Sequence, residues 1–256
     1  MLRIALGVEY DGAHFHGWQI QPGVRTVQEE LEKALSRVAD RPVRVQCAGR
    51  TDTGVHGVGQ VAHFDTEARR SPRSWVLGAN ANLPFDINLT WAQPVDGSFH
   101  ARFSATSRDY RYIILNRMTR SSLWRNHAVW THRPLDEDRM RQAAQLLVGT
   151  HDFSSYRALG CQAKSPVRTI TRLDVSRQGD RVIIDVSANA FLHHMVRNIA
   201  GVLMAIGRGD EPVTWSREVL ERRDRTQGGV TAPPEGLYLM RVGYPDQFRI
   251  PEPPPL

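Results

Sequence analysis

The sequence predicts an α+β fold made of two similar halves, each with a mainly antiparallel sheet flanked by helices. Each half contains segments in the order strand, helix, strand, strand. The expected strands alternate apolar and polar residues, which is typical of sheets with one buried face. In the second half, a Gln178-Gly179-Asp180 turn joins two alternating segments, which indicates an antiparallel hairpin. The halves share an order of elements without a strong residue-level repeat.

The first half begins with an alternating strand over 2–10 and continues with an amphipathic helix over 26–40. Thr26 is expected to cap this helix, with Glu29 completing a capping box. Two further strands are expected at 43–47 and 60–64. The stretch AGRTDTGVHG between them is therefore predicted to be a loop.

The second half begins with the strand YRYIIL over 110–115, and a helix is expected near 136–148. Another helix is expected over 192–206, because its apolar residues recur at steps of three and four. The apolar positions on its predicted buried face are Leu192, Met195, Val196, Ile199, Leu203 and Ile206. Arg197 falls near the edge of this face.

The repeated order of elements suggests a domain boundary near Ser104, with an N-terminal α+β domain over 1–103 and a C-terminal α+β domain over 104–256. The final residues, PEPPPL, cannot form a helix or the interior of a sheet, since proline lacks a backbone N–H. They are expected to form extended surface chain.

The chain carries 33 basic and 27 acidic residues, a net charge of +6, and only two of its cationic side chains are lysines. Guanidinium groups can grip phosphate with two hydrogen bonds, so nucleic acid is a plausible partner. A codon-driven preference for arginine would give the same composition. The two cysteines match no disulfide or metal-binding spacing, which favours a reducing compartment and a cytoplasmic location. No apolar run has the length of a membrane helix, and the histidines lack companion ligands, so neither a membrane span nor a metal is expected.

The AGRTDTGVHG loop places one carboxylate, Asp52, among glycines and hydrogen-bonding residues. Arg50 lies two residues earlier, so in an extended chain both side chains would face one pocket. Asp-Thr-Gly also opens the catalytic loop of aspartic proteases, but those enzymes need two such carboxylates and the chain has no second motif. The phosphate-loop pattern is absent as well.

Five ordered motifs carry a resemblance to a known family. They are AGRTDTGVHG, FHARFSAT over 99–106, DYRYII over 109–114, ANAFLHHMVRNIAG over 188–201 and EGLYL over 235–239. Together they resemble the bacterial type of the tRNA pseudouridine synthase A family. The resemblance extends over essentially the whole chain, beginning with EYDG near the start.

The resemblance implies the pseudouridine synthase fold, a homodimer, and a cofactor-free isomerase that converts uridine to pseudouridine at positions 38, 39 and 40 of the tRNA anticodon stem-loop. It implies that Asp52 is the catalytic aspartate and that Arg197 is its basic partner. It further implies that Arg50 helps to displace the target base, that Tyr110 stacks on this base, and that Leu237 contacts it.

The resemblance also suggests contacts with tRNA outside the catalytic pocket. The residues expected to make them are Arg70, His100, Arg102 and the segment Gly160, Cys161, Gln162, Ala163 and Lys164. Arginines in loops are more often solvated surface. A different class of function, a non-catalytic RNA-binding protein with two RNA-recognition-like modules, would explain the charge and the repeated element order. It would not explain a central aspartate, which repels phosphate, and the aromatic signature of such modules is absent.

Overall fold

The computed structural model describes all residues, Met1–Leu256, and contains two compact units. The first unit consists of Met1–Thr106 together with Tyr238–Leu256, and the second of Ser107–Leu237. The chain passes from the first unit to the second between Thr106 and Ser107, close to the boundary expected at 103/104. The return of the C-terminal segment to the first unit differs from the expected domain 104–256. It depends on a strand pairing between residues far apart in the sequence, for which the local pattern gives no signal.

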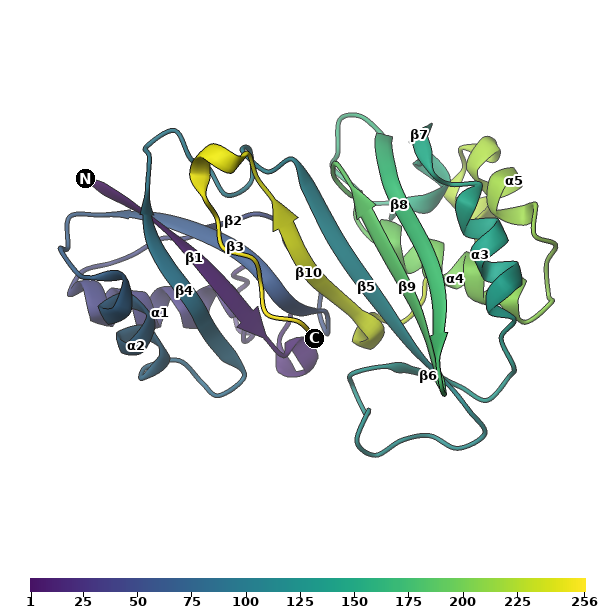
Figure 1. Cartoon of the computed structure of the whole chain (residues 1–256), viewed down its shortest axis with the longest axis horizontal. Coiled ribbons are helices and arrows are strands. Elements are labelled where there is room, and N and C mark those ends of the chain that lie inside the picture. The colour runs from purple at the N-terminus through teal and green to yellow at the C-terminus, as the bar shows by residue number, and fades with distance from the viewer. The chain divides into compact units, whose positions relative to one another are not determined.

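The first unit contains a sheet with the strand order β4-β1-β3-β10, and a short strand, β2, also pairs with β3 (Figure 1). The strands are β1 (Leu2–Tyr10), β2 (Gln46–Cys47), β3 (His56–Thr66), β4 (Ile87–Val95) and β10 (Leu237–Gly243). β1 is antiparallel to both β3 and β4. β10 is parallel to β3, with Tyr238 opposite His56.

Two helices belong to the first unit: α1 (Val27–Ala39) and α2 (Pro72–Asn80). They pack against each other, and α2 also packs on β4. The prediction of a capping box at the start of α1 is wrong. Thr26 occupies the N-cap position, but its side chain accepts no capping hydrogen bond and its buried Oγ1 has no partner. Glu29 instead pairs with Lys33 one turn later.

The strand expected at 43–47 is reduced to Gln46–Cys47, because side chains of α1 take backbone donors that a longer strand would use. The N–H of Val43 donates to Ser36 Oγ (2.9 Å), and the N–H of Val45 donates to Glu32 Oε1 (3.0 Å). The segment thus packs against the helix before it joins the sheet.

The second unit contains a sheet with the order β5-β9-β8-β7, with β6 added parallel to β5. Its strands are β5 (Ser107–Asn116), β6 (Val129–Thr131), β7 (Gly149–Asp152), β8 (Val167–Gln178) and β9 (Arg181–Ala188). The β5–β9, β8–β9 and β7–β8 pairs are antiparallel. Gly179 adopts a positive φ of 59° in the turn between β8 and β9, which confirms the expected hairpin.

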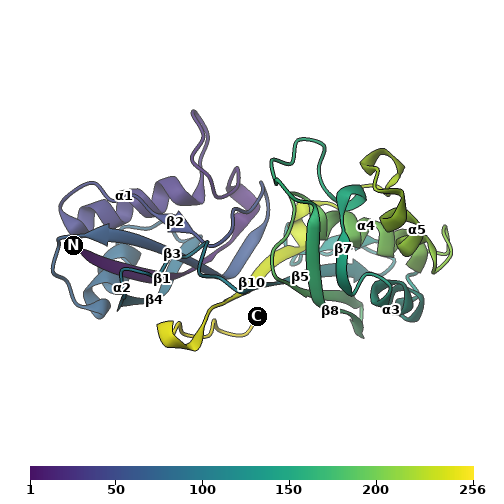
Figure 2. The ribbon, with the colours of Figure 1, turned by 90° about the horizontal axis from the view of Figure 1, so that it is seen from above.

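The helices of the second unit are α3 (Glu137–Gln145), α4 (Met195–Gly207) and α5 (Trp215–Arg222) (Figures 1 and 2). α3 packs on β8 and on α4, and α4 packs on β5. α4 begins three residues later than the apolar pattern predicted, because His194 adopts a left-handed conformation (φ 61°) at the N-cap position. All six predicted apolar positions are buried. The α+β class with mainly antiparallel sheets is therefore confirmed.

Short 3₁₀ segments occur at Gly12–His14, Ser154–Tyr156, Arg225–Gln227, Pro234–Gly236 and Asp246–Phe248. After β10, the C-terminal segment runs back over the sheet of the first unit (Figure 1). Gln93 Nε2 on β4 donates to the carbonyl oxygens of Phe248 and Arg249, and Pro253 lies against Gly59 of β3. Residues 251–256 contain no helix or strand, as the sequence predicted.

Candidate active site

The loop between β2 and β3 contains Asp52, and backbone hydrogen bonds on both sides fix its course. The N–H of Trp18 donates to the carbonyl of Thr51 (3.0 Å), and the N–H of Val55 donates to the carbonyl of Asp52 (3.1 Å). Gln60 Nε2 donates to the carbonyl of Gly49 (2.7 Å). Asp52 itself is half-buried. The carboxylate is therefore attached to a backbone that is held in place before any ligand arrives.

Gly17 shows how closely the segment before α1 approaches the Asp52 loop. Its φ of +84° lies in the left-handed region, and a Cβ atom there would come within 2.6 Å of the Thr51 carbonyl oxygen. Only glycine satisfies both conditions without strain. Tyr10 adds a second connection, since its hydroxyl shares a buried hydrogen bond with Thr51 Oγ1 (2.8 Å).

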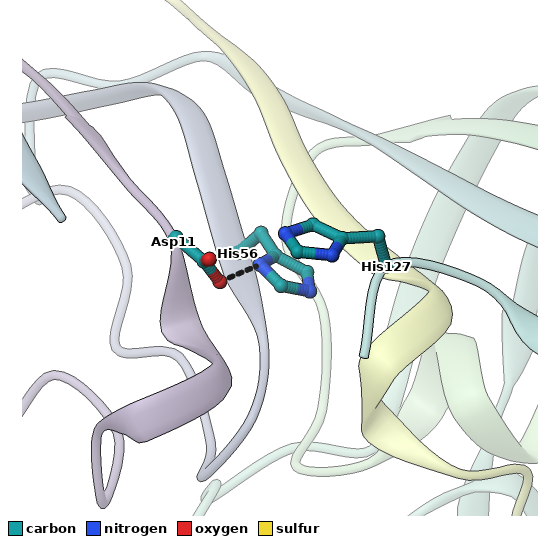
Figure 3. A group of neighbouring side chains, drawn as sticks. All are labelled: Asp11, His56 and His127. Carbon is teal, nitrogen blue, oxygen red and sulfur yellow. Dashed lines mark ion pairs between the residues drawn. The ribbon is translucent and has the colours of Figure 1, made fainter. Parts of the chain in front are cut away.

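His56 marks the end of the loop at the start of β3 and is 2% exposed. Its Nδ1 lies 3.0 Å from Asp11 Oδ1 (Figure 3) and 3.1 Å from the N–H of Gly12. The nitrogen donates to Asp11 when it carries a proton and accepts from Gly12 when it does not. The ring stacks on Tyr238 at the start of β10, with 4.6 Å between centroids. The base of the loop is thus joined to two neighbouring segments of the first unit.

Arg50 is exposed and lies three residues after Cys47. Burial of the Cys47 thiol raises its pKa to about 12, while the positive charges of Arg50 and Arg102 oppose this shift. A thiol with this pKa is protonated and unreactive at neutral pH.

His100 and Arg102 belong to a compact turn between β4 and β5. His100 Nδ1 accepts hydrogen bonds from the N–H groups of Arg102 (3.1 Å) and Phe103 (3.2 Å). Desolvation, followed by the charge of Arg3, lowers the pKa of His100. The neutral form suits this geometry, because a protonated Nδ1 could not accept.

Arg70 lies beyond the opposite end of β3 from Asp52. Its side chain donates to the carbonyls of Val38 (3.3 Å) and Arg69 (3.3 Å). An eleven-residue strand separates the two sites, so the structure does not bring Arg70 to the Asp52 loop.

The remaining predicted residues belong to the second unit or to its junction with β10. Tyr110 lies on β5 opposite Val186, and its ring contacts Phe191 edge-on, with centroids 5.0 Å apart. Arg197 on α4 is half-buried, as predicted, and its Nε donates to the carbonyl of Ala232 (2.8 Å). Leu237 begins β10 and is 6% exposed.

The 160–164 segment has no regular structure. Gly160, Gln162 and Lys164 are exposed, whereas Cys161 and Ala163 are half-buried. The N–H of Cys161 donates to the carbonyl of Ala158 (3.1 Å). This accessibility suits a surface contact better than catalysis.

The sequence did not identify the segment from Asp11 to Trp18 as part of the site, although it makes most of the contacts that hold the Asp52 loop. Gly17 within FHGW carried the only local signal, since glycine permits backbone conformations and close approaches that other residues do not. Within either unit alone, no three His, Cys, Asp or Glu side chains converge as they would around a metal ion. None of the helices combines the length and the apolar composition that crossing a bilayer requires.

Comparison with known proteins decides the family. A family model described as tRNA pseudouridine synthase matches residues 7–104 and 143–245. The chain is 60% identical over 250 residues to tRNA pseudouridine synthase A of Nitrosococcus oceani, an alignment that covers 98% of this chain and 96% of that protein. The chain belongs to the tRNA pseudouridine synthase family.

Other relatives agree. The proteins named tRNA pseudouridine synthase A from Methylococcus capsulatus and Pseudomonas aeruginosa are 61% and 59% identical to this chain, over 247 and 251 residues. These alignments cover 96% and 98% of this chain, and 91% and 88% of the relatives. As a tRNA pseudouridine synthase, the chain is an isomerase, and the non-catalytic alternative is not supported.

The chemistry of a pseudouridine synthase places clear demands on the site. The bond between uracil N1 and ribose C1′ breaks, the base turns, and a bond between C5 and C1′ forms, after which C5 loses its proton. The enzyme needs an ionised group next to the ribose, a surface that holds the detached base, and exclusion of water. A carboxylate on a pre-positioned loop can meet the first demand.

Proposed function

We propose that this enzyme converts uridines at positions 38, 39 and 40 of the tRNA anticodon stem-loop into pseudouridine, with Asp52 as its catalytic residue. The observation that carries the proposal is the fixed loop around Asp52, which the Thr51, Asp52 and Gly49 carbonyls attach to surrounding backbone and side chains. A pre-positioned carboxylate reacts without the entropic cost of ordering a loop at each turnover.

Asp52 serves one of two routes. In the first route, its carboxylate attacks C1′ as uracil departs, and the resulting ester bond breaks when C5 of the turned base bonds to C1′. In the second route, it removes the 2′ proton to give a glycal-like intermediate, and this proton returns to C2′ when uracil adds again through C5. In both routes the electron pair of the broken bond leaves with uracil, C5 forms the new bond, and the C5 proton is released to solvent. Neither route consumes a co-reactant, which agrees with the expectation of a cofactor-free enzyme.

Arg197 is the proposed basic partner of Asp52. A guanidinium next to a carboxylate favours the charged form and so offsets the effect of desolvation. Its Nε donates to the carbonyl of Ala232 (2.8 Å), which fixes the position of the guanidinium group.

The base must leave its stack before its glycosidic bond can be reached. Flipping a base costs a few kcal/mol, and stacking on an aromatic ring recovers ~1–3 kcal/mol per base. Tyr110 is proposed to stack on the flipped uracil, exposed Arg50 to occupy the vacated position, and Leu237 to contact the base. Arg70, Arg102 and the 160–164 segment are proposed as contacts with the RNA backbone.

The test is the release of tritium from C5 of uridine. Anticodon stem-loops would each carry a single labelled uridine, at position 38, 39 or 40, and a control stem-loop would carry it elsewhere in the arm. We expect release from the first three RNAs and none from the control. Release from the control alone would contradict the proposed site on tRNA.

We also propose a homodimer, which the resemblance implies, and a cytoplasmic location, which the two unpaired cysteines favour. Light scattering coupled to gel filtration should then give about twice the mass of one 28.9 kDa chain. A mass of one chain at micromolar concentration would exclude a stable dimer.

A further inference from the structure

Phe103 is an apolar side chain that the fold leaves open to solvent, since it is 75% exposed. It forms the outer end of a row of three rings that starts inside the first unit. His63 of β3 is 1% exposed and contacts His100, with 4.7 Å between ring centroids. His100 in turn contacts Phe103, with 4.3 Å between centroids and 35° between planes. One face of Phe103 is thus supported from below by a packed ring.

The backbone that carries Phe103 is tightly held. The N–H of Ala101 donates to His63 Nδ1 (3.1 Å), and Tyr244 Oη donates to the carbonyl of Ala101 (2.6 Å). Ser104 Oγ accepts from the N–H of His100 (2.9 Å). An exposed aromatic ring on a rigid turn loses little conformational entropy when a ligand covers it.

His100 supports the ring through its own hydrogen bonds. Its Nδ1 accepts from both Arg102 and Phe103 N–H groups, so the imidazole is a neutral acceptor that fixes the turn. An imidazole in this state offers phosphate no positive charge. The geometry therefore gives His100 a role different from the direct tRNA contact that the sequence suggested.

The charge next to Phe103 indicates the kind of partner. The Arg102 guanidinium lies over the Phe103 ring, 5.6 Å from its centroid. An exposed aromatic ring next to a guanidinium fits an unpaired nucleotide, whose base stacks while its phosphate meets the cation.

We propose that Phe103 is a base-stacking residue for an unpaired nucleotide of the tRNA substrate, and that His100 is the positioning residue that holds its ring. The proposal rests on the proposed function only in taking tRNA as the ligand. It assigns no role in bond breaking to either residue, so it stands or falls independently of Asp52.

The first test compares Phe103→Ala with Phe85→Ala. Phe85 is also in the first unit and is 99% exposed, which makes it a matched control for the loss of a surface ring. Binding of an unmodified tRNA transcript would be measured at several salt concentrations. Because stacking on one ring contributes on the order of a 10- to 100-fold gain in affinity, Phe103→Ala should weaken binding by about that factor, whereas Phe85→Ala should leave it unchanged.

Salt dependence and shape separate stacking from charge. Phe103→Ala should keep the slope of log affinity against log salt, since a neutral ring releases no counterions. Arg102→Ala should make this slope shallower. Phe103→Trp should retain affinity and Phe103→Leu should lose it, because leucine keeps apolar volume but has no flat face.

The role of His100 has its own test. His100→Asn supplies a side-chain oxygen that can accept from backbone N–H groups two and three residues later, so it should retain affinity. His100→Leu removes the acceptor and should weaken binding as Phe103→Ala does, but it should have no further effect in a Phe103→Ala background. Additive losses would show that His100 contacts the RNA itself.

Three results would overturn the proposal: equal affinity of Phe103→Ala and Phe85→Ala for tRNA, a changed salt slope in Phe103→Ala, or a change in oligomeric state without a change in affinity. The last result would mean that Phe103 packs against a second copy of the chain. Failure of the wild-type protein to bind tRNA at all would instead contradict the proposed function.

Discussion

The Asp52 loop and the 160–164 segment are both irregular connections between strands, and both were predicted to meet tRNA, yet the fold holds them differently. The Asp52 loop accepts hydrogen bonds from Trp18, Val55 and Gln60. The 160–164 segment is mostly exposed and is held mainly from its flanks, as by the bond from Ala158 to the carbonyl of His193. Bond breaking needs a fixed carboxylate, whereas contact with a phosphate backbone tolerates adjustment. Changes near the first loop should therefore affect turnover, and changes in the second should affect affinity alone.

Among changes that leave Asp52 itself intact, the largest effect on kcat is expected from Gly17→Ala. A Cβ atom would meet the Thr51 carbonyl oxygen at 2.6 Å and would require strained backbone at φ +84°. Strain of this kind costs about 1–3 kcal/mol, and displacement of the Asp52 loop should lower kcat by roughly 100-fold, as misplaced catalytic groups do.

Gly23→Ala is the matched control for this change. Gly23 has a similar φ of +76°, but a Cβ atom there meets nothing within 4 Å. It should cost stability without affecting kcat at a temperature where both variants are folded. Equal kcat values for the two variants would show that the contact with the loop is unimportant.

A smaller effect is expected from Tyr10→Phe, which removes the buried hydrogen bond to Thr51 Oγ1. Loss of such a bond costs about 1 kcal/mol, and a looser loop should lower kcat several-fold with little change in KM. Tyr156→Phe also removes a buried hydroxyl bond, to the carbonyl of Ser216 in the second unit (2.8 Å). Tyr156→Phe should lower the thermal midpoint about as much as Tyr10→Phe does, but it should leave kcat unchanged. An equal loss of kcat in both variants would show that the bond to Thr51 has no special effect on the Asp52 loop.

The free energy of unfolding should depend on pH through His63, whose Nδ1 accepts a hydrogen bond from Ala101 in the turn that carries Phe103. Burial, with a smaller effect of the neighbouring His100 and Arg3, lowers the pKa of His63 from 6.5 to about 4. Between these values the unfolded chain binds more protons than the folded chain, so the free energy of unfolding should fall as pH falls from 6.5 towards 4. His63→Asn removes this titration, and its stability should depend less on pH in the same window. If the free energy of unfolding depended on pH equally in the wild type and in His63→Asn, the assignment to His63 would be wrong.

The smallest effect is expected from Lys164→Ala in the exposed segment. Loss of one phosphate contact should make the slope of log affinity against log salt shallower by ~0.7–0.9 and should leave kcat unchanged. Lys33→Ala is the natural control, because Lys33 is the other lysine of the chain and pairs with Glu29 on α1. Identical salt slopes for both variants would remove Lys164 from the RNA surface.

Local patterns predicted β1, β3, β5, β8 and β9 and the helices α1, α3 and α4, because apolar periodicity reports directly on burial. The elements α2, β4, α5 and β10 were not predicted. Local patterns also failed where one element supplies hydrogen bonds to another. Glu32 of α1 is buried and takes a backbone donor of Val45, which shortens β2, and no local pattern encodes this contact. The candidate site shows the same division between local features, which the sequence predicted, and contacts between distant segments, which it did not. The Asp52 loop was evident from its glycines, but the contact through Gly17 and the return of Tyr238 to stack on His56 join distant parts of the sequence.

The central claim is that the carboxylate of Asp52 performs the chemistry on a loop that the fold has already positioned. The most direct test is single-turnover release of tritium from C5-labelled tRNA by Asp52→Asn, with saturating enzyme so that binding does not limit the reaction. Asp65→Asn is the control, since Asp65 lies on the adjacent strand β3 and pairs with Arg3 at the surface. We predict tRNA affinity close to wild type for both variants, wild-type release for Asp65→Asn and no detectable release for Asp52→Asn. Release by Asp52→Asn within tenfold of the wild-type rate would contradict the account.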